Sequence, residues 1–291
     1  MNGSIQLPRR TKSATVATLL LLGLAAPAAF AHKIEKRFTV GVHPVIAVRN
    51  KSGKITIKSW QKNEVLVVAT HASEKTEVDA EQGGNRVDIV THLLSEDAGP
   101  ADLRADYEIT VPEESELQIR NDSGDVFVEH VSGDMTFDTV AADVDLQEVA
   151  GYLVIKTVSG SLVCKSCAGK IEVTSISGNF RIIQPITNNV LARTYSGSIF
   201  FDGAFLPGGT YVMTSYSGLI EVRFSESDSF RLNAASLYGK VENDAVLKQP
   251  QHNTQPAGPS KFKSAFFGTL NQGEARVELS SFNGTIKIRK R

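Results

Sequence analysis

The middle of the chain repeats a nine-residue unit. A small residue opens each unit, and apolar residues follow it at the second, fourth and seventh positions, as Val126, Val128 and Val131 follow Gly124. The first two apolar positions alternate as in a β-strand with one buried face, and the small residue marks a turn. The small residues stand at Gly124, Gly133, Ala142, Gly151, Gly160, Gly169 and Gly178. So regular a repeat indicates that successive units occupy equivalent environments.

Nine residues hold one short strand and one corner. Two opposed units make a closed rung, and rungs of about 18–21 residues stacked along one axis form a β-solenoid. A meander of antiparallel hairpins is the alternative. The third apolar residue, beyond the strand, favours the solenoid, and we expect it to face the interior at every corner. The predicted inner walls are Val128, Leu146, Cys164 and Ile182 on one side, and Phe137, Ile155 and Val173 on the other.

The repeat sets the predicted organisation of the chain. Residues 115–291 are predicted to form the β-solenoid, and residues 32–114 an N-terminal β cap with the first strands. A cap is expected because an open solenoid end exposes unpaired strand edges. Residues 245–274 interrupt the pattern with a stretch rich in Pro, Gln and Asn, which predicts a flexible insert.

The N-terminus has the features of an export signal. Arg9, Arg10 and Lys12 precede an apolar run, and Ala29-Phe30-Ala31 supplies a small-x-small cleavage pattern. We expect residues 1–31 to be a signal peptide and the mature chain to reach the periplasm, cell surface or extracellular space. A membrane anchor is the alternative, but the apolar run is shorter than the ~20 residues that span a bilayer. No stable membrane span is therefore expected after cleavage.

The charge of the mature chain excludes one class of partner. The whole chain has 31 basic and 32 acidic residues, and removal of residues 1–31 takes away three basic residues and no acidic one, which leaves −4. Nucleic-acid binding requires a dense cationic face. We therefore expect no nucleic-acid partner.

Cys164 and Cys167 form a C-x-x-C pair, a spacing found in redox and zinc sites. They lie four and seven positions after Gly160, where neighbouring units place aliphatic side chains. Buried free thiols are the favoured interpretation, because free cysteine packs as a small hydrophobic residue. A local disulfide remains an alternative. A metal site is disfavoured because no second Cys or His pair has ligand spacing.

Asp125, Asp134 and Asp143 follow the small residue of their units, which raises the possibility of a calcium site. Nonapeptide calcium-binding repeats place an aspartate in every unit. Here the later units have other residues instead, so we expect solvated corner carboxylates and no metal. Asp125 and Asp143 should stack on one corner and Asp134 on the other. The replacing residues are Tyr152, Ser161, Lys170 and Asn179.

Enzymes that cleave polysaccharides also use β-helices, with paired carboxylates on an outer groove. Outward groups are available, but no cluster of unlike titratable side chains can be identified. We therefore predict no catalytic residues and no cofactor; a carbohydrate-active lyase or hydrolase is the alternative. The outward titratable groups are His130, Asp138, Glu148, Lys156 and Glu172.

Three further outward positions are apolar, namely Phe127, Val154 and Val163. Apolar residues on an outer face indicate a surface covered by the cap, by the insert or by a partner.

Three segments carry a resemblance to a known family: VRNKSGKITIKSW, YEITVPEESELQIRNDSGDVFVEHVSGD and SSFNGTIKIRK. Together with the serial Ser-Gly units, they resemble the bacterial putative-adhesin domain family of unknown function, over roughly residues 40–290. The resemblance implies an adhesin-like β-solenoid in an exported setting, and it brings no catalytic residues. The expected function is non-enzymatic binding of an envelope or surface component, protein or glycan, through a β-face or an open solenoid end.

Overall fold

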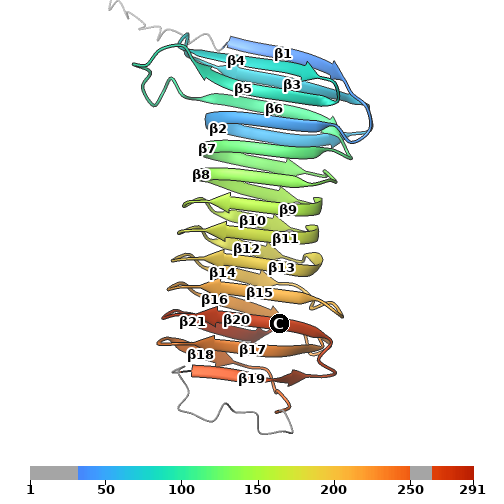
Figure 1. The fold of residues 1–291 in the computed structure, drawn as a ribbon, viewed down its shortest axis with the longest axis vertical. Helices are drawn as coiled ribbons and strands as arrows, with labels where there is room; N and C mark the ends of the chain where they lie inside the picture. The colour runs from blue at the N-terminus through green and yellow to red at the C-terminus, as the bar shows by residue number, and fades with distance from the viewer. Residues whose placement is uncertain (1–31, 250–263) are drawn as a thin grey trace, which may run out of the picture. The chain divides into compact units, whose positions relative to one another are not determined.

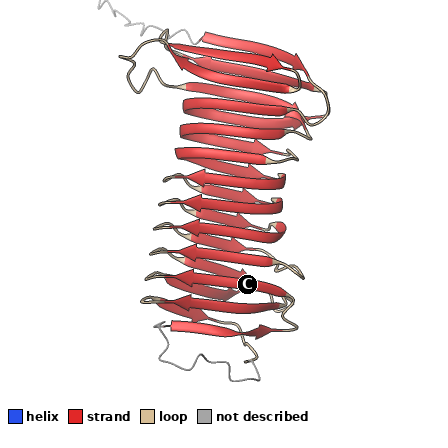
Figure 2. Ribbon diagram, viewed as in Figure 1, coloured by secondary structure: helices blue, strands red, loops and turns tan. Residues whose placement is uncertain are grey.

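The computed structural model describes residues 32–249 and 264–291, which form strands and loops (Figure 2). The strands stack one above the other around a single core (Figure 1). The predicted all-β solenoid is confirmed. The predicted signal peptide and residues 250–263 of the predicted insert lie outside the described residues.

The strands form two walls. We call them the first and the second wall, in the order in which the chain passes through them within each rung. The first wall contains, in spatial order, β4 (Thr76–Gly83), β5 (Arg86–Leu93), β9 (Ala150–Thr157), β11 (Ala168–Ser175), β13 (Ile186–Thr194), β15 (Thr210–Ser215), β20 (Ala275–Ser281), β17 (Phe230–Ser236) and β19 (Ser264–Leu270). The second contains β1 (His32–Thr39), β3 (Glu64–His71), β6 (Ala105–Pro112), β10 (Leu162–Lys165), β12 (Phe180–Ile183), β14 (Ile199–Asp202), β16 (Ile220–Phe224), β21 (Thr285–Lys290) and β18 (Lys240–Asn243). Three long strands, β2 (Val45–Trp60), β7 (Glu116–Glu129) and β8 (Met135–Gln147), pass a corner and belong to both walls between the N-terminal strands and the rest.

The fourth-position residues line the two walls as predicted. On the second wall, Leu146 pairs with Val128 and with Cys164, and Cys164 pairs with Ile182. On the first wall, Ile155 pairs with Phe137 and with Val173. All seven are buried. Burial of one large apolar side chain contributes about 1.5–3 kcal/mol, so the stacked walls account for much of the stability.

In six rungs one corner is closed by a buried hydroxyl, and we call this corner of the stack the serine–glycine corner. Here a Thr or Ser at the end of a first-wall strand accepts a hydrogen bond from the backbone N–H of the glycine three residues later. The pairs are Thr157–Gly160 (3.0 Å), Ser175–Gly178 (2.7 Å), Thr194–Gly197 (3.0 Å), Ser215–Gly218 (2.8 Å), Ser281–Gly284 (2.8 Å) and Ser236–Gly239 (3.0 Å). The residue after the hydroxyl then points out of the solenoid.

The other corner turns through a residue in the left-handed conformation. His130, Glu148, Ser166 and Gln184 have φ between 49° and 57° and follow one another at intervals of eighteen residues, the length of one rung. The seventh-position residues Val131, Val149 and Cys167 at this corner are buried.

The expectation that seventh-position residues face the interior at every corner is wrong at the serine–glycine corner. Val140, Val158 and Ile176 are 47%, 43% and 57% exposed there. The hydroxyl residue before each of them points inward, where Thr157 and Ser175 accept a hydrogen bond from the glycine N–H, and successive residues of extended chain point to opposite sides. The solenoid therefore has one apolar corner on its outside.

The two cysteines are buried in the core, as their register predicted. The left-handed turn at Ser166 brings their Cα atoms to 5.9 Å, and a disulfide joins Cys164 to Cys167. The interpretation that favoured free thiols is therefore wrong, and the disulfide alternative holds.

Both ends of the stack depart from the repeat. At the N-terminal end, β1, β3 and β4 run antiparallel to their neighbours. At the other end, the C-terminal strands β20 and β21 lie between the rung of β15 and β16 and the rung of β17 and β18 (Figure 1). Part of the predicted flexible insert 245–274 is strand β19, which pairs with β17, so the insert prediction is wrong for residues 264–270.

Candidate functional site

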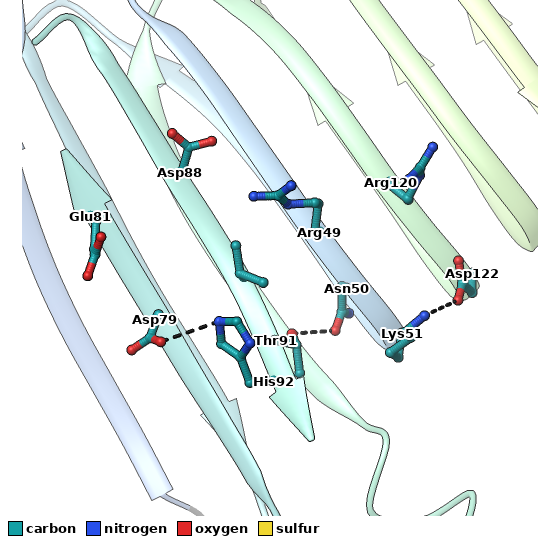
Figure 3. Close-up of a pocket in the computed structure, with 11 residues that line it drawn as sticks. Arg49, Asn50, Lys51, Asp79, Glu81, Asp88, Thr91, His92, Arg120 and Asp122 are labelled. Atoms are coloured by element: carbon teal, nitrogen blue, oxygen red, sulfur yellow. Dashed lines mark hydrogen bonds and ion pairs between the residues drawn. The ribbon is translucent and has the colours of Figure 1, made fainter. Parts of the chain in front are cut away.

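A depression lies on the outer side of the first wall, near its N-terminal end. We call it the N-terminal depression; its volume is about 700 Å³ (Figure 3). Strands β2, β4, β5 and β7 bring together chain segments that are distant in sequence. The lining residues are Arg49, Asn50, Lys51, Asp79, Glu81, Asp88, Val90, Thr91, His92, Arg120 and Asp122.

Charged side chains of both signs border the N-terminal depression. His92 Nε2 lies 3.3 Å from a carboxylate oxygen of Asp79, and Lys51 Nζ lies 3.1 Å from one of Asp122. Arg49 is the exception: it lies between Val90 and Arg120 in the sheet, is exposed, and makes no ion pair within the described residues. Its guanidinium is therefore available to an anionic or hydrogen-bond-accepting group.

The neighbouring Arg120 is already engaged. Its guanidinium donates a hydrogen bond to Asp138 at 2.8 Å, and this bond raises the pKa of Arg120 above its usual range. Two adjacent arginines repel each other unless a carboxylate compensates one of them. Asp138 supplies that compensation, so Arg49 can stay uncompensated beside Arg120.

A buried hydrogen-bonded group supports the depression from inside. The Thr91 hydroxyl donates to Asn50 Oδ1 at 2.7 Å and lies 2.5 Å from the Tyr107 hydroxyl. Burial raises the pKa of Tyr107 to about 12, although the hydrogen bond to Thr91 opposes the shift. Tyr107 therefore stays protonated at neutral pH and cannot act as a base there.

The pKa shifts of the carboxyl groups are relevant to catalysis, because acid catalysis needs a carboxyl group that stays protonated. A hydrogen bond from Lys58 lowers the pKa of Glu129, and one from Lys170 lowers the pKa of Glu172. Every carboxyl group with a resolved pKa shift in the described residues is shifted downward. A glycosidase requires one carboxyl with a raised pKa as its general acid. The lowered pKa values of these six carboxyl groups reflect hydrogen bonds and ion pairs, and none of the six lines the N-terminal depression.

The outward groups considered for catalysis do not converge. Asp138 and Lys156 are neighbours across β8 and β9 on the first wall. Glu172, two rungs along from Asp138, is paired with Lys170 at 2.6 Å on the same wall. Glu148 lies at the left-handed corner, 2.9 Å from His130. These groups therefore meet only in separate pairs, spread over the first wall and the left-handed corner, and none of them lines the N-terminal depression.

The corner aspartates act as backbone acceptors. Asp143 accepts a hydrogen bond from the N–H of Ser161, one rung later, at 2.7 Å, and Asp134 accepts one from Tyr152 at 3.4 Å. Asp125 and Asp143 stack on one corner and Asp134 lies on the other, as predicted. In residues 32–249 and 264–291, no group of three or more His, Cys, Asp or Glu could hold a metal ion.

The outward apolar residues do not share one surface. Phe127 and Val163 lie on the second wall, on either side of Asp145, whereas Val154 lies on the first wall. All three are half-buried, and the Lys58 ammonium lies 5.7 Å from the Phe127 ring centre. Whether residues 250–263 cover any of them lies outside the described residues.

Sequence reasoning missed the N-terminal depression. Its residues come from four strands spread over residues 49–122, outside the regular repeat, so no short motif unites them. The one signal was indirect, because Arg49, Asn50 and Lys51 belong to a segment that carried the family resemblance.

In the described part of the chain, no helix is long and apolar enough to cross a membrane. The comparison with curated proteins finds no match.

Solved structures with a similar course of the chain include three bacterial proteins. A putative adhesin from Parabacteroides merdae has 10% sequence identity, and the match covers 88% of this chain and 95% of that one with a TM-score of 0.44. A putative adhesin from Bacteroides fragilis has 12% identity, 89% and 97% coverage and a TM-score of 0.42. A putative cell adhesion protein from Clostridium sporogenes has 12% identity, 89% and 100% coverage and a TM-score of 0.24.

A family model describes nearly the whole stack of strands. Residues 43–289 match the model of the Toastrack DUF4097 family. The matched range begins just before β2 and ends within β21, so it includes the rungs and the N-terminal depression. This chain therefore belongs to the Toastrack DUF4097 family, a domain family of unknown function with a β-solenoid fold.

Proposed function

We propose that this chain is an exported, non-enzymatic, adhesin-like protein that binds an envelope or surface component, protein or glycan, through the outer side of its first wall. The observation that carries the proposal is the N-terminal depression with Arg49 uncompensated at its centre. A guanidinium presents several fixed donors and binds carboxylate, phosphate or sugar hydroxyl oxygens well. The surrounding ion pairs form a polar rim typical of recognition surfaces.

The non-enzymatic part of the proposal is supported by the state of the carboxyl groups. Catalysis needs titratable groups with shifted pKa values that converge on one cleft. Here the shifted carboxyl groups are all held in their ionised form, and the outward acids and bases are distributed over a wall and a corner.

The binding test uses the chain purified from the exported fraction, with isolated peptidoglycan and envelope membrane vesicles as the probes. We expect retention by at least one of the two, and a loss of about tenfold in affinity for Arg49→Ala, because one charge-assisted hydrogen bond is worth about 1.4 kcal/mol or more. Arg193→Ala is the matched control, since Arg193 is an exposed arginine on β13 of the same wall, outside the depression. Equal losses in both variants, or no retention of the parent chain, would contradict the proposal.

A measurement of polysaccharide turnover distinguishes the binding proposal from the alternative of a carbohydrate-active enzyme. Incubation with bacterial polysaccharides should release no new reducing ends or unsaturated sugars. Measurable turnover that Asp138→Asn or Glu172→Gln abolishes would replace the binding proposal with a carbohydrate-active enzyme.

Export is tested by the mass of the chain recovered outside the cytoplasm. Cleavage after Ala31 predicts a polypeptide that begins at His32. Recovery of the full-length chain in the cytoplasm alone would reject the exported location.

A further inference from the structure

An exposed apolar ladder runs along the serine–glycine corner, where the residue after each hydroxyl points outward. Its residues succeed one another in adjacent rungs and are, in spatial order, Val140, Val158, Ile176, Tyr195, Tyr216, Phe282 and Leu237, of which Leu237 is half-buried and the other six are exposed. We call this set the corner ladder. Ile176 and Tyr195, near its middle, are 57% and 56% exposed.

The corner ladder is continuous. The rings of Tyr195 and Tyr216 stack with centres 4.5 Å apart and an angle of 5° between planes, and Tyr216 and Phe282 stack at 4.5 Å and 10°. In the next rungs towards the N-terminus, the equivalent positions carry Lys51 and Asp122, which form an ion pair at 3.1 Å. The apolar line therefore starts abruptly at Val140.

One side of the corner ladder is polar and uncharged, whereas on the other side the outward residues two positions before the ladder include Asp138, Lys156 and Arg193. The residue after the ladder residue is Ser159, Ser177, Ser196, Ser217 or Asn283 in five consecutive rungs, and it is Ala141 or Tyr238 in the two end rungs. In a chain with 22% charged residues, an uncharged border of this length removes, on that side of the ladder, the like-charge repulsion that usually keeps identical copies apart. A contiguous apolar patch on a soluble protein also typically marks an interaction surface.

The stacking of the rings decides against a sugar as the occupant. Carbohydrate recognition by aromatic residues uses an open ring face, as cation recognition does. The faces of Tyr216 are covered by Tyr195 on one side and Phe282 on the other. At Tyr216 only the ring edge is left to point outward, which suits packing against another apolar ridge.

We propose that the corner ladder binds the corner ladder of a second copy of this chain, with the two solenoids antiparallel and related by a two-fold axis through Tyr195. The ladder has small β-branched residues at one end and large side chains at the other. Antiparallel pairing therefore places Val140 opposite Leu237, Val158 opposite Phe282 and Ile176 opposite Tyr216. Tyr195, the fourth of seven rungs, meets its own copy.

The size of the corner ladder fits such a dimer. Seven rungs at about 4.8 Å spacing give a ridge roughly 30 Å long. With its serine border, a ridge of this length provides an area of the order of the 800 Å² per partner that a stable complex buries. A parallel arrangement would place small residues opposite small ones and leave gaps, which close-packed interfaces do not tolerate.

Oligomeric state provides the first test. Sedimentation of the parent chain should show a dimer at about 10 μM protein, since interfaces of this size bind with micromolar or tighter affinity. Tyr195→Lys and, independently, Ile176→Lys should weaken dimerisation at least tenfold, because each places two ammonium groups in an apolar contact. Ile186→Lys is the matched control: Ile186 is 67% exposed and lies away from the corner ladder, at the start of β13.

Disulfide trapping tests the antiparallel register. Oxidation should cross-link Tyr195→Cys to itself, whereas Val158→Cys and Phe282→Cys should cross-link with each other when mixed and not with themselves. The native Cys164 and Cys167 are buried and bonded to each other, so they do not interfere. Circular dichroism of each variant confirms that it is folded.

Three outcomes would overturn the proposal. They are a monomer at all concentrations, a dimer that Ile186→Lys weakens as much as Tyr195→Lys does, and self-cross-linking of Val158→Cys. Protection of Tyr195 in the monomer by peptidoglycan or vesicles would assign the corner ladder to another ligand instead. The proposal does not depend on Arg49, so dimerisation and envelope binding can fail separately.

Discussion

At the residue scale, the glycines of the serine–glycine corner are required by the close approach of successive rungs. A Cβ atom added to Gly197 would lie 1.8 Å from the carbonyl oxygen of Gly178 in the rung before, and one added to Gly218 would lie 1.8 Å from that of Gly197. The backbone of the neighbouring rung cannot move aside for a Cβ atom, whereas the end of a flexible side chain could. The glycine of the repeat is thus a consequence of stacking as much as of turn geometry.

The first prediction follows from this contact. Gly197→Ala should lower the free energy of unfolding by about 1–3 kcal/mol, the usual cost of an overpacked site. Gly83→Ala is the matched control, because a Cβ there meets nothing within 4 Å. Urea unfolding monitored by circular dichroism measures both. Equal midpoints for the two variants would show that the rungs can separate at this corner.

The cysteines show what a repeat can predict about a residue. The register predicted that both side chains point into the core, because their sister residues are aliphatic. It could not predict the bond, since a register gives the side of the chain and not the geometry of the turn between two positions. The left-handed conformation of Ser166 sets the geometry of this turn, and serine has no special preference for that conformation.

The second prediction concerns this disulfide. The exported protein, unfolded without reductant, should take up no thiol-alkylating reagent. Cys164→Val with Cys167→Val should cost about 2 kcal/mol at most, because the disulfide closes a very short loop and the valines refill the volume. Mass spectrometry after alkylation and a thermal melt are the measurements. Two alkylated thiols in the unreduced chain would restore the free-thiol interpretation.

At the element scale, the strands could be predicted and the two kinds of corner could not. Alternation of apolar residues predicted the strands and both walls. A nine-residue unit predicts the same structure for every corner, whereas the true unit is a rung of eighteen residues with two different corners. The sixth position contained the signal: it is Thr139, Thr157 or Ser175 at one corner and His130, Glu148 or Ser166 at the other. Without that distinction the corner ladder was assigned to the core.

The third prediction tests the hydroxyl of the serine–glycine corner. Thr194→Val removes the acceptor of the buried Gly197 N–H and should cost about 1–3 kcal/mol, the penalty for an unsatisfied buried donor. Thr139→Val is the matched control, because the Thr139 hydroxyl oxygen is buried without a hydrogen-bond partner within the described residues. That substitution should be neutral or slightly stabilising.

Thermal unfolding of both valine variants gives the comparison. Both changes replace a hydroxyl with a methyl group at the same corner, so packing contributes similarly to each. A smaller loss for Thr194→Val than for Thr139→Val would reject the role of the hydroxyl.

At the scale of the whole molecule, the order of the rungs departs from the order of the sequence. The C-terminal rung, β20 and β21, lies between two rungs that precede it in the chain. The sequence pattern could not predict this, because every unit has the same apolar register and is a compatible neighbour for every other. The N-terminal depression is unpredictable for a related reason, since it depends on which distant strands become neighbours.

The last prediction follows from the position of the C-terminal rung. Chain ends usually exchange amide hydrogens rapidly, because they fray. Here β20 is hydrogen-bonded to β15 and β17, and β21 to β16 and β18, so residues 275–290 should exchange as slowly as β13 in the middle of the stack. Strand β1, at the other end of the described chain, pairs with β3 alone among the described strands and should exchange at least tenfold faster. Hydrogen exchange followed by mass spectrometry of the parent protein measures both segments. Rapid exchange of residues 275–290, at the rate of β1, would mean that the C-terminal rung is not inserted between the other two.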